Sequence, residues 1–203
     1  MRILDVSTAE GAPMSALSPP PWPQRLERVP MSLAEFLALP EKPKAEYVDG
    51  EAIVMPPSSR GHNRVQWQVA QLLKASLAPE LDVALDAGWR HAGRLRIPDI
   101  AVFETDRRDD DIVWDDDVPI LVVEVLSPST AGEDKVRKSR EYQRAGVAQY
   151  WMVDRARRTL SVDSNDGDGW ERLLDLDDEH PAGSVVVGTW GEVAVDLHAL
   201  LQH

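Results

Sequence analysis

The sequence predicts an α/β or α+β domain, in which a central mixed sheet is flanked by helices. Three observations predict it: an amphipathic helix pattern at 62–77, a nearly continuous apolar run at 119–126, and short strand patterns separated by Gly and Pro turns. The apolar run is typical of a central strand covered on both faces. An extra hairpin is expected before this core, and extra strands after it.

The elements follow from local signals. Ser32 and Glu35 form a capping box, which predicts a short helix ending at Pro40. Asp49-Gly50 between apolar segments predicts a two-residue hairpin. The later elements expected are strands at 81–89 and 95–103 (the second interrupted by Pro98), a helix at 131–145 ended by Gly146, a strand at 147–154, a hairpin at 159–175, and a strand, turn and short helix at 184–202.

The length and composition bound the class of protein. A chain of 203 residues is long enough for one packed domain and a tail. Residues 1–30 contain six prolines without an apolar period, so we expect a disordered tail at 1–30 and a single domain at 31–203. The chain contains no cysteine, which excludes disulfide scaffolds, thiolate metal sites and cysteine nucleophiles. With neither a membrane-spanning run nor a secretory pattern, a cytoplasmic protein is expected.

The charge is unevenly distributed. A formal net charge of −13 disfavours a nonspecific nucleic-acid coat. Basic residues nevertheless gather at 90–96 and 135–144, whereas acidic residues gather at 106–117 and 163–179. This pattern fits a polyanion site bounded by solvating loops, and each segment taken alone fits an ordinary solvated face equally well.

Two carboxylates lie inside apolar strands. Glu124 interrupts the run at 119–126, where an unpaired buried carboxylate would cost several kcal/mol. It either faces water at the end of the strand or pairs with a cation there. Asp99 follows Pro98 in a second apolar segment. Two such acids would repel each other without a counterion, and a divalent metal bound through oxygen atoms removes the conflict. Without cysteine ligands, Mg²⁺ is favoured over zinc.

A basic group is expected near these acids. Asp134, Lys138 and Tyr142 are spaced four residues apart, so they share one face of the predicted helix after Glu124. Lys138 is therefore the favoured cation, with Lys135 as its competitor. A solvated helix face is the alternative for either lysine.

These motifs, taken in order, resemble a known family. Pro98-Asp99 followed by Glu124 on the next apolar strand is similar to the metal-binding core of the PD-(D/E)XK nuclease superfamily. The chain most closely resembles the bacterial Uma-two family of restriction endonucleases, formerly a domain of unknown function, over about residues 31–200. The matching segments are 31–36, 46–51, 97–102, 123–130, Asp134, Lys138, Tyr142, 145–147 and 150–154.

The resemblance implies a restriction-endonuclease-like core and a Mg²⁺-dependent endonuclease that hydrolyses phosphodiester bonds of DNA. Asp99, Glu124 and the carbonyl of Val125 would bind Mg²⁺, for which Mn²⁺ would substitute. Lys138 would orient the attacking water or stabilise the developing charge, and Glu46 would complete the catalytic set.

One position departs from the general superfamily pattern. The superfamily places a lysine two residues after the acid, where this chain has Leu126. The Uma-two family is similar in lacking it and supplies the lysine from the following helix, here Lys138. Candidates for contacting the substrate are Arg94, Arg96, Lys135, Arg140 and His62, with Arg90 and Arg137 as further phosphate contacts.

Two other functions are alternatives to a nuclease. A catalytically weak or inactive nuclease-like fold that binds nucleic acid or protein is favoured by Leu126 and by the net negative charge. Metal-independent hydrolysis by paired carboxylates, as in glycosidases, lacks a sugar-stacking aromatic cluster, because the seven Trp are scattered. The expected partner is nucleic acid, with DNA favoured, RNA and a homodimer left open, and no membrane.

Overall fold

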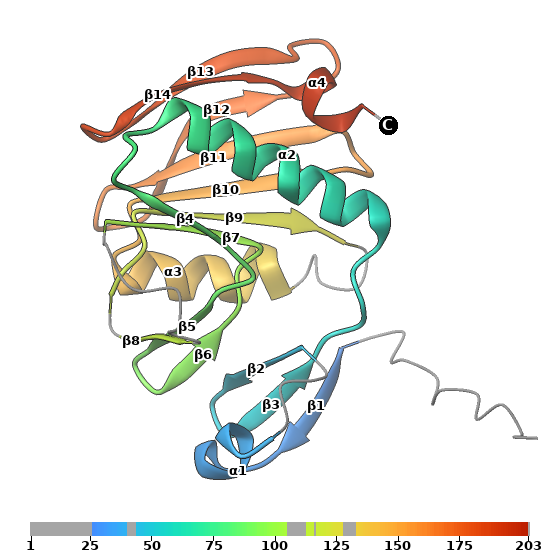
Figure 1. Ribbon diagram of the computed structural model, residues 1–203, viewed down its shortest axis with the longest axis vertical. Helices are drawn as coiled ribbons and strands as arrows, with labels where there is room; N and C mark the ends of the chain where they lie inside the picture. Colours follow the sequence, from blue (N-terminus) through green and yellow to red (C-terminus); the bar gives the residue numbers. More distant parts are fainter. Residues whose placement is uncertain (1–25, 40–43, 105–112, 116, 128–132, 203) are drawn as a thin grey trace, which may run out of the picture.

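A computed structural model describes residues 26–39, 44–104, 113–115, 117–127 and 133–202, with only the backbone described at 113–115 and 133–135. These residues form two six-stranded sheets and one two-stranded sheet (Figure 1). The elements are β1 (Glu27–Pro30), α1 (Leu33–Leu37), β2 (Ala45–Val48), β3 (Glu51–Val54), α2 (Arg60–Ser76), β4 (Asp82–Leu85), β5 (Gly88–His91), β6 (Arg94–Arg96), β7 (Ile100–Phe103), β8 (Val113–Asp115), β9 (Leu121–Leu126), the π-helix η1 (Glu133–Lys138), α3 (Ser139–Ala145), β10 (Gln149–Asp154), β11 (Thr159–Asn165), β12 (Trp170–Leu176), β13 (Ala182–Val187), β14 (Gly191–Asp196) and α4 (Leu197–Leu201).

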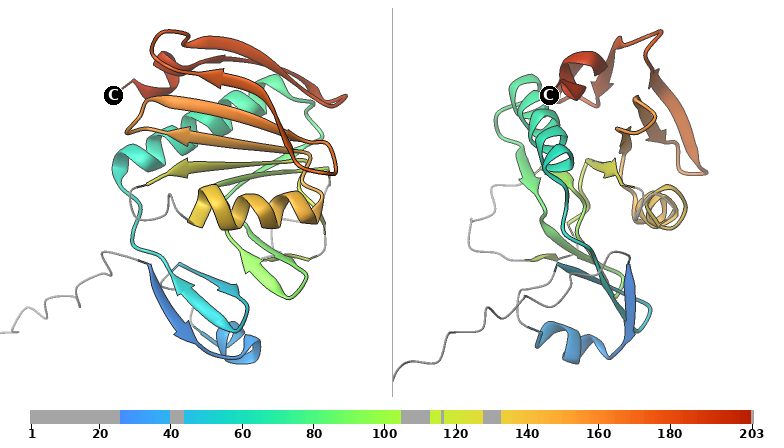
Figure 2. Two further views of the ribbon diagram at one scale, coloured as in Figure 1. Left: turned by 180° about the vertical axis from the view of Figure 1, so that it is seen from behind. Right: turned by 90° about the vertical axis from the view of Figure 1, so that its right-hand side faces the viewer.

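The central sheet has the strand order β12-β11-β10-β9-β7-β4. It is mixed, because β9 and β10 run parallel while the other neighbouring pairs run antiparallel. Every residue of β9 is buried, which confirms the predicted central strand. Helix α2 covers one face of this sheet and α3 covers the other, as the edge view in Figure 2 shows.

The N-terminal sheet has the order β1-β3-β2-β6-β5-β8. Its β2–β3 turn has positive φ at both Asp49 (51°) and Gly50 (88°), as the predicted two-residue hairpin requires. The capping box of Ser32 and Glu35 at the start of α1 is also present. The predicted tail at 1–30 is wrong at its end, because Glu27–Pro30 pairs with β3. These four residues are exposed, and backbone pairing with β3 holds them in place. Because their side chains do not pack in a core, the sequence shows no apolar periodicity there. Residues 1–25 lie outside the described residues.

Each of the two strands predicted between residues 81 and 103 is divided between the sheets. Asp86 has a φ of 50°, and the strand divides there, with β4 in the central sheet and β5 in the N-terminal sheet. Pro98, which lacks a ladder donor, lies between β6 and β7. Between residues 81 and 103 the chain therefore crosses between the sheets twice, and the second of these crossings carries Asp99.

The predicted helix at 131–145 has two parts where it is described. The π-helix η1 comes first, and α3 follows and ends at Gly146, whose φ of 90° is the left-handed conformation expected for a helix-terminating glycine. The C-terminal segment forms a hairpin of β13 and β14 where one strand was predicted. In the described part of the chain, no helix has the length and apolar character needed to cross a membrane.

Candidate active site

Glu124 lies on β9 and is only 2% exposed. Its Oε1 atom accepts hydrogen bonds from Lys138 Nζ at 3.0 Å and from the Tyr142 hydroxyl at 2.8 Å. Burial, and then the charge of Glu124, raise the pKa of Tyr142 well above its ordinary value, so the phenol stays protonated and donates. Glu124 is thus buried with a cationic partner and does not face water.

Lys138 joins the two sheets. It is the last residue of η1, is 3% exposed, and places Nζ 3.0 Å from Glu124 Oε1 and 3.0 Å from Glu46 Oε1. Glu46 comes from β2 and is 1% exposed. Burial raises the pKa of Glu46, but the charges of Lys138 and Arg96 and the Ile97 N–H outweigh it and hold the pKa below its usual value. Glu46 therefore remains ionised beside the lysine.

Asp99 lies at the crossing between the sheets and is held from several sides. Its Oδ2 accepts a hydrogen bond from the Val125 N–H at 2.8 Å, and its Oδ1 lies 3.2 Å from His62 Nε2 and 3.8 Å from Lys44 Nζ. Burial raises the pKa of Asp99, but His62 and the nearby lysines lower it further than burial raises it. Asp99 and Glu124 therefore both adjoin Val125, one through a hydrogen bond and one through the chain.

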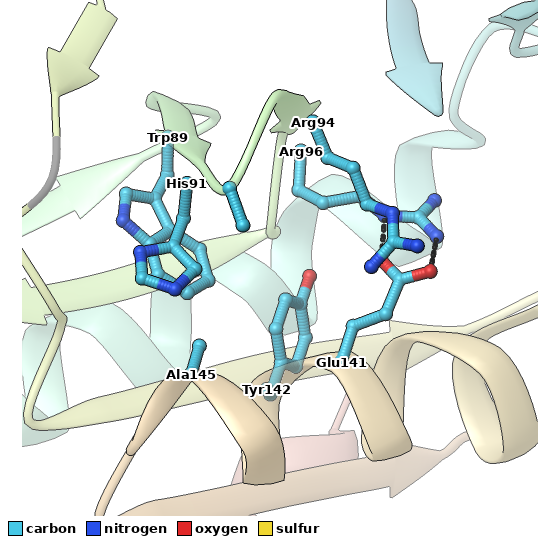
Figure 3. Close-up of a pocket in the computed structure, with 8 residues that line it drawn as sticks. Trp89, His91, Arg94, Arg96, Glu141, Tyr142 and Ala145 are labelled. Carbon is cyan, nitrogen blue, oxygen red and sulfur yellow. Dashed lines mark hydrogen bonds and ion pairs between the residues drawn. The ribbon is translucent and has the colours of Figure 1, made fainter. Parts of the chain in front are cut away.

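Arg96 lies beneath this group in a buried ion pair. The β2–β6 register pairs Tyr47 with Leu95, which places Glu46 beside Arg96. Arg96 Nη1 donates to Glu46 Oε2 at 2.7 Å. Its Nε and Nη2 atoms donate to the two carboxylate oxygens of Glu141 on α3, at 2.7 and 2.8 Å, as a two-pronged fork. Figure 3 shows this fork reaching from β6 to the helix. Arg96 is only 2% exposed, and its ion pair with Glu46 orients that carboxylate.

The other residues predicted to contact substrate are placed differently from one another. His62 is buried against Asp99, and Arg94 pairs with Asp49 at 2.8 Å at the molecular surface. Arg140 is exposed on α3. The side chain of Lys135 lies outside the described residues.

A shallow pocket adjoins the group on the side of Tyr142. Figure 3 shows its lining, in which the rings of Trp89 and His91 stack with centroids 5.5 Å apart. The lining residues are Trp89, His91, Ala92, Arg94, Arg96, Glu141, Tyr142 and Ala145. Tyr142 and Arg96 thus separate this pocket from the buried carboxylates.

Sequence reasoning missed several members of the group. Lys44, which precedes β2, forms ion pairs with Asp99 and Asp86. Glu141 accepts hydrogen bonds from the guanidinium of Arg96. For Glu141, the available signal was its position four residues after Arg137, with which it forms an ion pair at 3.4 Å. Lys44 gave no signal, because its partners are distant in sequence.

The donor chemistry of the group suits a hard divalent cation. Asp99 and Glu124 supply carboxylate oxygens on either side of Val125, whose carbonyl is a third oxygen of the kind that Mg²⁺ binds. Lys138 and Lys44 offset part of the negative charge of these acids. Among the side chains that the structure describes, no three His, Cys, Asp or Glu residues gather into a metal-binding group. A metal here would therefore depend on two carboxylates and backbone or solvent oxygens.

Comparisons with known proteins show the fold and the family of this chain. A crystal structure at 1.96 Å resolution, titled as a "putative nuclease belonging to DUF820" from Anabaena variabilis ATCC 29413, superimposes with a TM-score of 0.71. The two chains are 22% identical, and the match covers 85% of this chain and 98% of the other, which confirms the expected nuclease-like α+β fold. No curated protein matches. Residues 33–194 match the family model Uma2, described as "Putative restriction endonuclease", so the chain belongs to the Uma2 family, the Uma-two family that its motifs resemble.

Proposed function

We propose that this protein is a Mg²⁺-dependent endonuclease that hydrolyses phosphodiester bonds of DNA. The observation that carries the proposal is the placement of Lys138 Nζ, at 3.0 Å from both Glu124 and Glu46, at the end of the central sheet where Asp99 lies. Burying a lysine among carboxylates costs free energy of desolvation, and such buried charges are common at catalytic sites. In a nuclease, the lysine would stabilise negative charge on the reacting phosphate. Membership of the Uma2 family supports the same activity.

Each residue has a role in this proposal. Asp99, Glu124 and the Val125 carbonyl would hold Mg²⁺, which supplies a water of lowered pKa and offsets charge on the phosphate. The ammonium group of Lys138 would donate a hydrogen bond to the oxygen on which negative charge develops. Glu46 and Tyr142 fix its position, the first by an ion pair and the second by sharing Glu124 Oε1.

Cleavage of plasmid DNA tests the proposal. The wild-type protein should cut with Mg²⁺ or Mn²⁺ and stop in chelator. Lys138→Ala should lose on the order of 10²-fold or more in rate, the scale of removing one transition-state donor. Lys135→Ala, its competitor three residues earlier, should lose far less. Calorimetry of the same variants should show that Lys138→Ala still binds Mn²⁺.

Because removal of a buried lysine can weaken folding, each variant is first checked by circular dichroism, and Lys138→Arg provides a variant that keeps the charge. Equal cutting by the Lys138 and Lys135 variants would contradict the assignment of Lys138. Absence of cutting by folded wild-type protein with every divalent metal would contradict the endonuclease.

A second function is favoured by one specific observation. Glu124 already has Lys138 as a basic neighbour, and Asp99 has His62 and Lys44, while Leu126 occupies the position of the usual superfamily lysine. This pairing also fits a nucleic-acid-binding module that does not cut. Such a module would bind DNA equally well in Mg²⁺ and in chelator, whereas the nuclease requires the metal for cleavage.

A further inference from the structure

The exposed face of α2 differs in charge from the rest of this acidic protein. The chain has a formal net charge of −13, yet the 17 residues of α2 include no Asp or Glu. Exposed residues recur along it every three or four positions, so they follow one face of the helix. We call them the α2 stripe: Arg60, Arg64, Trp67, Gln71 and Lys74.

Trp67 is the unusual member of the α2 stripe. It is 56% exposed, although its helix already has an apolar face made by residues such as Val65, Val69 and Leu73. Trp67 therefore contributes little to the core. A Trp ring beside cationic side chains is the arrangement on which an unpaired base stacks while the cations contact phosphates.

The cations of the α2 stripe are available for a partner. Arg60, Arg64 and Lys74 form no ion pair with any residue that the structure describes. Arg155, in the β10–β11 turn, adds a fourth positive charge beside the start of α2, where its Nη1 bonds Ser59 Oγ at 3.4 Å. Its guanidinium lies directly against Gly61, in space that a side chain at that position would fill.

The α2 stripe begins at the candidate active site. His62, in the first turn of the helix, places Nε2 3.2 Å from Asp99 Oδ1. In Figure 1, α2 begins at the end of the central sheet where β9 ends and then runs back across the sheet. From Arg60 to Lys74 the helix rises about 21 Å, which is long enough to contact several nucleotides of one strand.

We infer that the α2 stripe binds a single nucleic-acid strand, with its cations on phosphates of that strand and an unpaired base stacked on Trp67. The inference deepens the proposed function, on which it rests, by naming the surface that leads the strand to the site. A single strand is specified because a base in an intact duplex has no free face to offer to Trp67.

Fluorescence anisotropy tests this surface in the full chain. The probe is a fluorescein-labelled 20-nucleotide DNA, titrated in chelator over a range of salt concentrations. Trp67→Ala should weaken binding about tenfold. Arg64→Gln should reduce the slope of log K against log[salt] by about 0.7, the value for one phosphate contact on a single strand. The matched controls are Leu173→Ala, exposed on β12, and Arg144→Gln, exposed on α3 across the sheet.

The outcomes separate this surface from the chemistry. Binding that depends on Trp67 and Arg64, without cutting in any metal, supports the surface and overturns the nuclease. Metal-dependent cutting with unchanged binding by both variants overturns the surface and leaves the nuclease. Failure of the wild-type protein to bind the oligonucleotide at any salt concentration would overturn the proposed surface. A change of oligomeric state in the Trp67→Ala variant, measured by light scattering, would also overturn it, because the face would then join two copies of this chain.

Discussion

At the scale of single residues, the buried charges near β9 are arranged as alternating signs. Lys138 lies between Glu46 and Glu124, and Arg96 lies between Glu46 and Glu141. Taking an ion out of water costs several kcal/mol, and partners at hydrogen-bond distance offset that cost. Removal of one member therefore leaves its neighbours buried with one charged partner fewer.

Lys138→Met keeps most of the side-chain volume and removes the charge. At pH 7 it should lower the free energy of unfolding by about 3 kcal/mol, because Glu46 and Glu124 then face each other in a buried place. The loss of a cation raises the folded-state pKa of the carboxyl that loses this partner. The penalty should therefore be complete above that raised pKa and should shrink as the pH falls through it toward 4.5, the ordinary pKa of Glu46. Urea melts at several pH values measure this.

The wild-type protein should show the opposite dependence. The folded-state pKa values of Glu46 and Asp99 lie below their ordinary values of 4.5 and 3.8, so their contribution to stability is complete above those values and is lost as the pH falls through the lowered ones. Adding Glu46→Gln to Lys138→Met should recover part of the lost stability at pH 7. Equal destabilisation of the single variant at pH 4 and pH 7 would contradict the charge argument.

At the scale of elements, α3 follows Lys138, carries Tyr142 and depends on a glycine for its end. Gly146 has a φ of 90°, and no atom lies within 4 Å of a Cβ added there. Gly146→Ala should therefore cost about 1 kcal/mol through backbone strain alone, without a clash. Gly169→Ala is the matched control, because Gly169 also has open space but no positive φ. Thermal melts that place the two variants at the same stability would show that the left-handed turn is not required.

The sequence predicts those elements whose signals are local. The capping box, the Asp49-Gly50 turn, the apolar run of β9 and the stop at Gly146 all depend on neighbours within a few residues, and each is present. The division of the strands between two sheets was not predicted, because the change of sheet takes only the short segment between Arg96, which ends β6, and Ile100, which begins β7. The fork of Arg96 was likewise hidden, since its partners lie 50 and 45 residues away along the chain.

The composition of the N-terminal segment does not predict β1, and truncation can test how much this strand contributes to stability. A chain beginning at Leu26 keeps every described contact of β1, whereas one beginning at Met31 loses the pairing of Glu27–Pro30 with β3. We expect the first truncation to melt at the temperature of the full chain. The second exposes the edge of β3 and should melt several degrees lower. A full-length chain and a chain from Met31 with the same melting temperature would show that β1 adds nothing to the sheet.

At the scale of the whole molecule, two sheets meet at the candidate active site. The N-terminal sheet supplies Glu46 and Arg96, and the central sheet with its helices supplies Glu124, Lys138 and Glu141. The ion pairs at this meeting lie beside apolar contacts, because Trp89 of β5 packs in one buried cluster with Phe103, Val122 and Tyr142. The candidate active site therefore lies where the two sheets dock through both ion pairs and apolar packing.

Arg96→Met tests this coupling. It removes the cation that joins Glu46 of β2 to Glu141 of α3. Because both carboxylates lose that partner, it should cost about 3 kcal/mol, concentrated where the sheets meet. Hydrogen exchange followed by mass spectrometry should show faster exchange in β2 and β3, with β9 and β10 protected as before, because local opening of the N-terminal sheet becomes easier than global unfolding. Arg158→Met is the control, since its pair with Asp178 is exposed and such pairs contribute about 0–1 kcal/mol. Uniformly faster exchange through both sheets would instead mean that they open as a single cooperative unit.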